Sequence, residues 1–141
     1  MPERVHMNLL RSRFALALTL VAATSLFTAG CNDTSAPEFP LGNVVVVVTD
    51  VNGAPVDLVE VDLMLTDKVT LWRTAVTGSD GKATFGSGEG GVLVQDYLVF
   101  FPQQVQYTLA PGETNYKPIT VVEGQTVTVQ LKVAKVVITP A

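Results

Sequence analysis

Two stretches of the sequence alternate between apolar and polar residues, residues 57–65 (DLVEVDLML) and residues 125–133 (QTVTVQLKV). The apolar residues that share a face are Val59, Val61, Leu63 and Leu65 in the first stretch, and Val127, Val129, Leu131 and Val133 in the second. Successive side chains of a β-strand point to opposite faces of its sheet, so this alternation is typical of a strand with one buried face. We therefore expect two half-buried strands of an antiparallel sheet.

Five further segments have the composition of β-strands, and none has a persuasive helical period. The first, residues 43–50 (NVVVVVTD), is a run of β-branched residues. The others are residues 70–76, 82–85, 92–101 and 116–122. Turn sequences such as DVNGAP and GSDG separate these segments. The pattern predicts an all-β fold, a seven-stranded antiparallel Greek-key β-sandwich of the prealbumin-like or immunoglobulin-like type.

The N-terminal residues 1–30 have the three parts of a secretory signal peptide. Arg4, Arg11 and Arg13 give a basic start, and residues 14–27 (FALALTLVAATSLF) are apolar or small and carry no charge. The small residues that a signal peptidase requires follow at once. The apolar run is shorter than the roughly 20 residues of a membrane-spanning helix. We therefore expect this segment to direct export and to be removed.

Cys31, the only cysteine of the chain, follows this signal directly. The sequence TAGC, with Leu26 slightly upstream, resembles the lipobox of bacterial lipoprotein precursors. The resemblance implies that Cys31 is diacylated on sulfur by fatty acids such as palmitate, becomes the first residue after cleavage, and is then N-acylated. Two or three acyl chains anchor a protein stably, whereas one does not. An ordinary signal peptide with an incidental cysteine is the alternative.

Two details of the N-terminus concern the start of translation and the destination. Met7 is an alternative start to Met1, because Arg11 and Arg13 would still supply the basic end. Asn32 stands after the cysteine, where an aspartate would favour the inner membrane in some Gram-negative bacteria. By this analogy the outer membrane is favoured if the cell is Gram-negative, and the inner membrane or a Gram-positive surface remains as an alternative.

Removal of the signal leaves an acidic protein. Residues 1–30 hold three of the nine basic and one of the 13 acidic residues, so the mature chain keeps six basic and 12 acidic residues and a net charge of −6. This charge gives no electrostatic basis for binding nucleic acid or an anionic membrane surface. The expected organisation is a signal peptide (1–30), a lipidated N-terminus with a flexible tether (31–41), a β-sandwich (42–137) and a tail (138–141).

Three motifs of the mature chain resemble the carboxypeptidase regulatory-like family of prealbumin-type sandwiches. They are D-x-NG-x-PV at residues 50–56, T-x-SDGKATF at residues 77–85 and V-x-x-GQTVTVQL at residues 121–131. The likeness covers most of residues 43–133 and is looser over residues 101–115. It implies a seven-stranded Greek-key sandwich, and related folds include the collagen-adhesin B-like repeats.

Residue types that usually perform catalysis or bind metals are scarce in the mature chain. The only histidine, His6, lies in the signal, so zinc sites and Ser–His–Asp or Cys–His catalysis lack their usual parts. Asp50, Asn52, Asp57 and Asp80 carry oxygen atoms of the kind that calcium binds. Turn formation by itself explains aspartate and asparagine at these positions. We therefore expect no enzyme, no cofactor and no metal site.

Residues 96–101 (DYLVFF) are apolar on both faces of the expected strand. A central strand with a loop across its outer face accounts for this pattern without any functional role. Alternatively, one set of side chains is exposed and forms a contact surface. In that case the candidate residues for contact with a ligand or a partner are Tyr97, Phe101, Tyr107 and Tyr116. Aromatic surfaces of this kind suit sugars or partner chains.

Three classes of function remain. The first is a lipid-anchored envelope protein with a non-catalytic β-sandwich, which touches the membrane through the lipid on Cys31 and supports or binds an envelope protein. The second is a carbohydrate- or peptide-binding lipoprotein that uses the aromatic surface around residues 97–101, so that a glycan is a candidate ligand. The third is an enzyme, which the scarcity of catalytic residue types disfavours. The sequence favours the first class.

Overall fold

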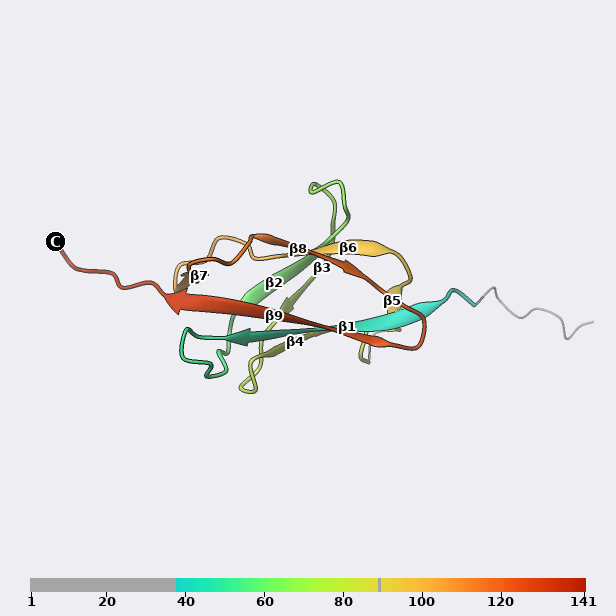
Figure 1. Cartoon of the computed structure of the whole chain (residues 1–141), viewed down its shortest axis with the longest axis horizontal. Coiled ribbons are helices and arrows are strands. Elements are labelled where there is room, and N and C mark those ends of the chain that lie inside the picture. The colour runs from blue at the N-terminus through green and yellow to red at the C-terminus, as the bar shows by residue number, and fades with distance from the viewer. Residues whose placement is uncertain (1–37, 89) are drawn as a thin grey trace, which may run out of the picture. The chain divides into compact units, whose positions relative to one another are not determined.

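In a computed structural model, which describes residues 38–88 and 90–141, the β-rich segments form nine strands in two layers (Figure 1). The strands are β1 (Leu41–Thr49), β2 (Glu60–Met64), β3 (Leu71–Val76), β4 (Lys82–Phe85), β5 (Val92–Leu93), β6 (Asp96–Phe100), β7 (Tyr107–Leu109), β8 (Tyr116–Thr120) and β9 (Thr126–Lys135). The described residues contain no helix that is long and apolar enough to cross a membrane. The predicted all-β sandwich is confirmed.

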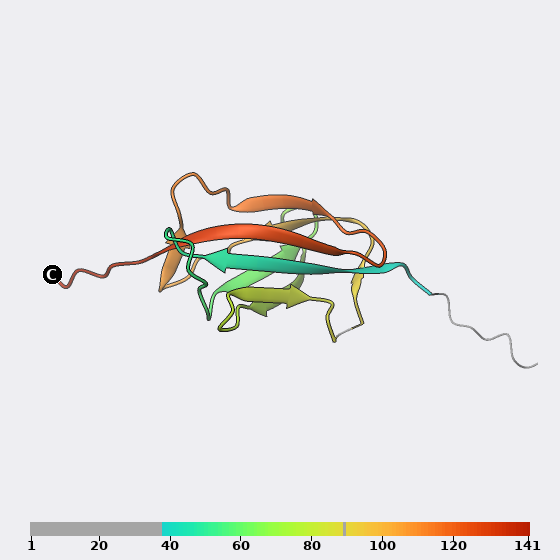
Figure 2. The same ribbon diagram turned by 60° about the horizontal axis from the view of Figure 1, so that its bottom comes forward.

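The two sheets differ in the direction of their strands. One sheet has the order β4–β1–β9–β7, with β5 beside the start of β1, and the other has the order β3–β2–β6–β8 (Figure 2). All pairs are antiparallel except β1 with β9, which run in parallel from Asn43 opposite Thr126 to Thr49 opposite Lys132. The expectation of a purely antiparallel sandwich is therefore wrong, because the first and last strands of the domain lie side by side and point the same way.

The core lies between the sheets, on the faces that the alternation predicts. In β2 and just before it, Val59, Val61 and Leu63 are fully buried. In β9, Val129, Leu131 and Val133 are buried, while the residues between them are exposed. Phe85 from β4 and Tyr97 from β6 are the largest side chains with no exposed surface. Burial of these apolar side chains stabilises the fold, since no disulfide is available within residues 38–141.

The valine run of β1 forms the centre of its sheet. Val44, Val46 and Val48 are fully buried between the layers, and the valines between them are partly buried. β1 has β4 on one side and β9 on the other. A run of five valines on an open edge would invite aggregation, and its two neighbours remove that hazard.

The number of strands is nine, not the seven that the sequence predicts. Residues 92–101 form two strands, β5 and β6, because the chain bends between Leu93 and Asp96. β7 has three residues and lies in a region that the sequence does not identify as a strand. The Greek-key connection of the strands stays a prediction.

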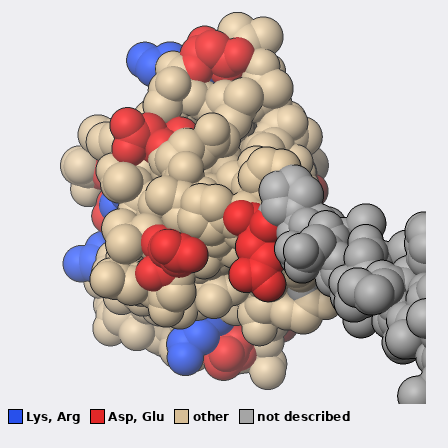
Figure 3. All heavy atoms as spheres, turned by 90° about the vertical axis from the view of Figure 1, so that its right-hand side faces the viewer, with Lys and Arg blue, Asp and Glu red and all other residues tan. Residues whose placement is uncertain are grey.

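The sandwich has two ends with different contents. The entry end holds the start of β1 and the β8–β9 turn, and its acidic residues include Glu38, Asp96 and Glu123, whereas the β2–β3 loop projects from the side of the sandwich (Figure 1). Figure 3 shows this end with acidic side chains spread across it and basic ones near its outline. The exit end, where β9 finishes, holds the β1–β2, β3–β4, β6–β7 and β7–β8 connections. Most of the connecting chain therefore gathers at the exit end.

Candidate functional site

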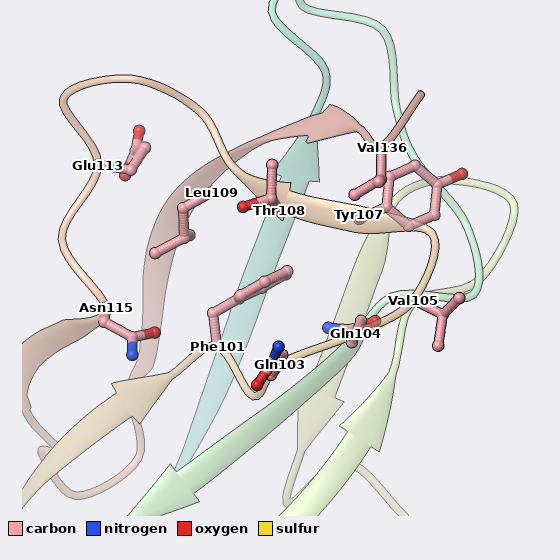
Figure 4. Close-up of a pocket in the computed structure, with 10 residues that line it drawn as sticks. All are labelled: Phe101, Gln103, Gln104, Val105, Tyr107, Thr108, Leu109, Glu113, Asn115 and Val136. Carbon is pink, nitrogen blue, oxygen red and sulfur yellow. The ribbon is translucent and has the colours of Figure 1, made fainter. Parts of the chain in front are cut away.

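A groove of about 600 Å³ opens at the exit end, between β7 and the loops on either side of it (Figure 4). Nine of its ten lining residues lie within residues 101–115, and the tenth is Val136. This volume is in the range of protein sites for small ligands or for a few residues of a peptide. Because three segments of chain meet here, the shape of the groove depends on how the two loops are held.

The β6–β7 loop is attached to the first residue of β2 by one glutamine. The side-chain oxygen of Gln104 accepts a hydrogen bond from the N–H of Glu60 at 3.0 Å, and its Nε2 donates one to the carbonyl oxygen of Glu60 at 2.8 Å. A side-chain amide that binds both backbone groups of one residue imitates the pairing of a neighbouring strand. It therefore fixes one wall of the groove.

The opposite wall is the β7–β8 connection, which begins with a tight turn. The N–H of Glu113 donates to the carbonyl oxygen of Ala110 at 3.1 Å, and Gly112 between them has a φ of +88°. Proline followed by glycine at the two central positions is typical of a type II turn, which needs a positive φ at the second. Glu113 also forms an ion pair of 2.5 Å with Lys117 in β8. This wall is thus held at both of its ends.

The lining of the groove is apolar at its floor and uncharged at its rim. Phe101 and Leu109 form the floor, and Figure 4 shows the Phe101 ring pointing toward β7 between Gln103 and Asn115. The side-chain amides of Gln103 and Asn115 make no hydrogen bond within the part of the chain that the structure describes. Glu113 is the only ionisable acid or base with a charge at neutral pH among the ten lining residues, and Lys117 neutralises it. The groove therefore suits an uncharged ligand with apolar groups and hydrogen-bonding groups.

Two of the four aromatic residues proposed as surface contacts are in the interior. Tyr97 has no exposed surface, and Phe101 is 5% exposed. Both side chains point toward the other sheet, because they alternate with the outward residues Leu98 and Phe100 on β6. The expectation that Tyr97 and Phe101 lie on an exposed surface is wrong, although the small exposed part of Phe101 belongs to the groove.

The other two aromatic residues lie apart from each other. Tyr107 is partly buried and lines the groove from β7. Tyr116 stacks on Phe100 across the outer face of the second sheet, with ring centroids 4.8 Å apart. The ammonium group of Lys68, in the β2–β3 loop, lies 5.2 Å from the centre of the Tyr116 ring. A loop residue thus covers part of this face, and the four aromatic residues do not form one surface.

The β2–β3 loop that carries Lys68 has a local carboxylate at its turn. Asp67 accepts hydrogen bonds from the hydroxyl and the N–H of Thr70 and from the N–H of Val69. These bonds, the Thr70 hydroxyl first, lower the pKa of Asp67. They also explain how the loop keeps its shape while Lys68 adopts a φ of +61°.

The phenol of Tyr97 is a buried polar group without a partner. Its hydroxyl makes no hydrogen bond within the described residues. Burial raises the pKa of Tyr97, and the nearby Gln95 side chain, which does not reach hydrogen-bond geometry, lowers it by less. The ring itself packs edge to face with Trp72 at 5.8 Å between centroids. The contact places Trp72 against the core.

Two of the three aspartates considered for calcium, Asp50 and Asp80, are engaged in turns. The carboxylate of Asp50 accepts the N–H groups of Asn52 and Ala54 at 2.8 and 2.9 Å, and that of Asp80 accepts the N–H of Lys82 at 3.1 Å. Across residues 38–88 and 90–141, no three histidine, cysteine, aspartate or glutamate side chains lie close enough to hold a metal ion together. Cys31, the proposed lipidation site, lies outside the described residues.

Comparison with known proteins identifies the fold. No protein-family model matches the sequence, and no curated protein matches it either. Among solved structures, the Bacillus anthracis TIE protein has a similar region (18% identity over 69% of this chain and 17% of that chain, TM-score 0.54). The minor pilin of Streptococcus agalactiae is similar over 73% of this chain and 48% of its own (17% identity, TM-score 0.55). A streptococcal ancillary pilin matches over 69% and 33% (14% identity, TM-score 0.53).

These likenesses establish a shared architecture. The described domain is a β-sandwich of the kind found in Gram-positive pilins, and it spans less than half of each of the three similar chains. The carboxypeptidase regulatory-like resemblance is not confirmed, since no family model matches. The groove lies in the region where the sequence departs from that family's pattern.

Proposed function

We propose that this chain is a bacterial envelope lipoprotein and that its β-sandwich is a non-catalytic module for binding or supporting other proteins. The observation that carries the proposal is the likeness of the fold to a minor pilin and to an ancillary pilin. The lipobox-like sequence ending at Cys31 would direct the protein to the cell envelope, and the acyl chains on Cys31 would anchor it in the membrane. The outer membrane is the favoured site if the cell is Gram-negative.

The arrangement of the domain supports an anchored module. β1 has nine residues and therefore separates the entry end from the exit end by about 30 Å. The chain from Cys31 reaches the sandwich at the entry end, whereas the loops and the groove are at the exit end. The acidic residues of the entry end offer no attraction to anionic lipids, so a fatty-acid anchor is the better explanation for membrane attachment.

The residue types of the domain support a non-catalytic role. Residues 38–141 contain neither histidine nor cysteine, and the carboxylates of Asp50 and Asp80 are occupied by turns. Exposed apolar side chains at the exit end, such as Leu58 and Val105, offer contacts of the kind that protein partners use. This is the surface on which we expect partners to bind.

The anchoring is tested with Cys31→Ser in cells labelled with radioactive palmitate. The wild-type protein should be labelled and should sediment with membranes, and Ser35→Ala, which leaves the lipobox intact, should behave like it. Cys31→Ser should lose the label and either appear in the soluble fraction or remain unprocessed. A labelled, membrane-bound Cys31→Ser protein would show that the anchor assignment is wrong.

The interaction role is tested with a photo-crosslinking amino acid at Val105, which is 79% exposed at the exit end. We expect a discrete protein adduct in intact cells. The same crosslinking amino acid at Thr128, which lies on the solvent-exposed face of β9, should give no protein adduct. Equal adducts at both positions, or no adduct at Val105, would contradict a partner surface at the exit end.

A further inference from the structure

Leu58, in the β1–β2 connection, has two features that do not help the protein to fold. Its φ is +56°, in the left-handed region where a leucine is strained and where glycine or asparagine is usual. Its side chain is 71% exposed, so it adds little to the core. Asparagine at this position would fit the backbone better and would expose no large apolar group. Folding therefore does not explain a leucine at position 58.

The backbone on both sides of Leu58 is fixed by Thr77. The hydroxyl of Thr77 bridges the carbonyl oxygen of Val56 and the N–H of Val59, and both valines are buried. The N–H of Leu58 donates to the carbonyl oxygen of Thr77 at 3.0 Å. These bonds hold Leu58 in its left-handed conformation, with the side chain directed away from the core. The leucine is thus presented to solvent from a rigid support.

Two further exposed apolar side chains lie near Leu58, around Glu60. Val76, at the end of β3, is 53% exposed and lies opposite Glu60 of β2, and cross-strand neighbours are about 5 Å apart. Val105 is 79% exposed and follows Gln104, whose side chain binds both backbone groups of Glu60. Figure 4 shows Val105 next to Gln104. We call Leu58, Val76 and Val105 the Leu58 patch.

The surroundings of the Leu58 patch are acidic. The chain segments that form it, residues 56–62, 74–80 and 100–106, contain four carboxylates and no lysine or arginine. Asp57 and Glu60, which flank Leu58 in the sequence, are exposed. A partner that brings a lysine or arginine to this surface is attracted by the opposite charge, whereas an acidic partner or an anionic membrane is repelled.

We propose that the Leu58 patch binds a segment of another protein in which a large apolar side chain is flanked by lysine or arginine. Leu58 supplies the central apolar contact, and Asp57 and Glu60 pair with the basic groups at the rim. The strained backbone then serves to hold an apolar contact outside the core. The inference rests on the interaction role proposed above, because it names the contact surface and the chemistry of the partner. It can fail while that role stands.

The first test uses the full chain in intact cells, with a photo-crosslinking amino acid at Val76. We expect a protein adduct. In the crosslinked peptide of the partner, identified by mass spectrometry, a large apolar residue and a lysine or arginine should lie within a few residues of each other. An acidic segment, a glycan, a second copy of this chain, or no adduct would overturn the proposal.

The second test separates a role in binding from a role in folding. Leu58→Asn should reduce the adduct at Val76 by at least about tenfold and should raise the midpoint of urea denaturation, because asparagine fits the left-handed backbone. Leu71→Asn is the matched control. Leu71 is 51% exposed on β3, and its substitution should neither reduce the adduct nor raise the midpoint. An unchanged adduct with Leu58→Asn, or a lowered midpoint, would show that the leucine does not serve as the contact.

The third test concerns the charges. Asp57→Asn with Glu60→Gln should reduce the adduct at Val76 by at least about threefold. Glu38→Gln with Glu123→Gln removes the same charge at the entry end and should leave the adduct unchanged. Equal effects would contradict a local charge match. If an adduct at Val105 forms and persists in every variant, the interaction role stands and the Leu58 patch is wrong; if none forms at either position, both proposals fail.

Discussion

The ammonium group of Lys117, in the edge strand β8, donates a hydrogen bond of 2.6 Å to the backbone carbonyl oxygen of Gln130 in β9. The two strands belong to different sheets. Lys117 thus connects the two sheets at the edge of β9 that does not pair with β1. Most of this edge has no neighbouring strand, because β7 pairs only with residues 133–135. A lysine at this place also hinders the addition of a foreign strand.

Lys117→Met should keep the aliphatic part of the side chain and remove both this link and the ion pair with Glu113. We expect the free energy of unfolding to fall by about 1 kcal/mol, since the hydrogen bond involves a charged donor but is partly solvated. Urea denaturation followed by circular dichroism measures the change. Lys132→Met, which alters an exposed lysine of β9, is the control and should change stability by less than about 0.5 kcal/mol. Equal effects would show that Lys117 contributes only its charge.

Thr77 is a buried threonine whose hydroxyl holds the β1–β2 connection. The hydroxyl donates to the carbonyl oxygen of Val56 at 2.7 Å and accepts the N–H of Val59 at 3.0 Å. Thr77→Val has the same shape but leaves both backbone groups without that partner, so it should cost about 2–3 kcal/mol in thermal or urea unfolding. Thr128→Val, on the exposed face of β9, should cost almost nothing. A loss below about 1 kcal/mol for Thr77→Val would mean that water replaces the hydroxyl.

Two glycines with similar backbone angles should respond differently to alanine. Gly53 and Gly81 have φ values of +87° and +72°. A Cβ at Gly53 would meet nothing within 4 Å, whereas one at Gly81 would lie 2.6 Å from the carbonyl oxygen of Val48. Gly53→Ala should therefore cost about 1–2 kcal/mol from the backbone angle, and Gly81→Ala more than about 3 kcal/mol from the angle and the clash together. Similar losses in denaturation experiments would contradict the close approach at Gly81.

Tyr97→Phe should not destabilise the protein at neutral pH. The phenol has no hydrogen-bond partner within the described residues, so its removal should change the free energy of unfolding by between zero and about 1 kcal/mol in the stabilising direction. A loss of more than about 1 kcal/mol would reveal a bound partner, such as a buried water.

The same variant should alter the stability of the protein in alkali. Burial raises the pKa of Tyr97 above the ordinary 10.0, so the unfolded chain releases this proton at a lower pH than the folded one. The wild type should therefore lose stability as the pH rises from about 10 through the raised pKa. Tyr97→Phe should lose less over that range in urea titrations at successive pH values. Identical pH profiles would contradict the burial of the phenol.

Local patterns in the sequence determined which parts of the fold were predictable. The alternation around Val61 and Leu131 identifies two strands and their buried faces, because apolar and polar residues differ at each step. The valine run of β1 does not show which of its two faces is buried, because both faces carry valines, such as Val45 and Val46. The parallel pairing of β1 with β9 has no local signal, because the partners are more than 80 residues apart.

The sequence predicts the candidate groove less well than it predicts the fold. Its amides, Gln103 and Asn115, are ordinary loop residues in the sequence, and only the arrangement of β6, β7 and their loops brings them to opposite sides of Phe101. Tyr107 was a candidate and does line the groove. The aromatic composition of residues 96–101 pointed to this region but not to its geometry, because apolar residues on both faces of β6 serve the core and the covered outer face.

The parallel pairing of β1 and β9 has a mechanical consequence. When a force pulls on the chain before Leu41 and after Lys135, the two neighbouring strands are drawn past each other along their length. Their backbone ladder is then loaded in shear, so its bonds must break together instead of opening one after another. A molecule tethered on one side and gripped on the other would thus resist tension better than one whose terminal strands could be peeled apart.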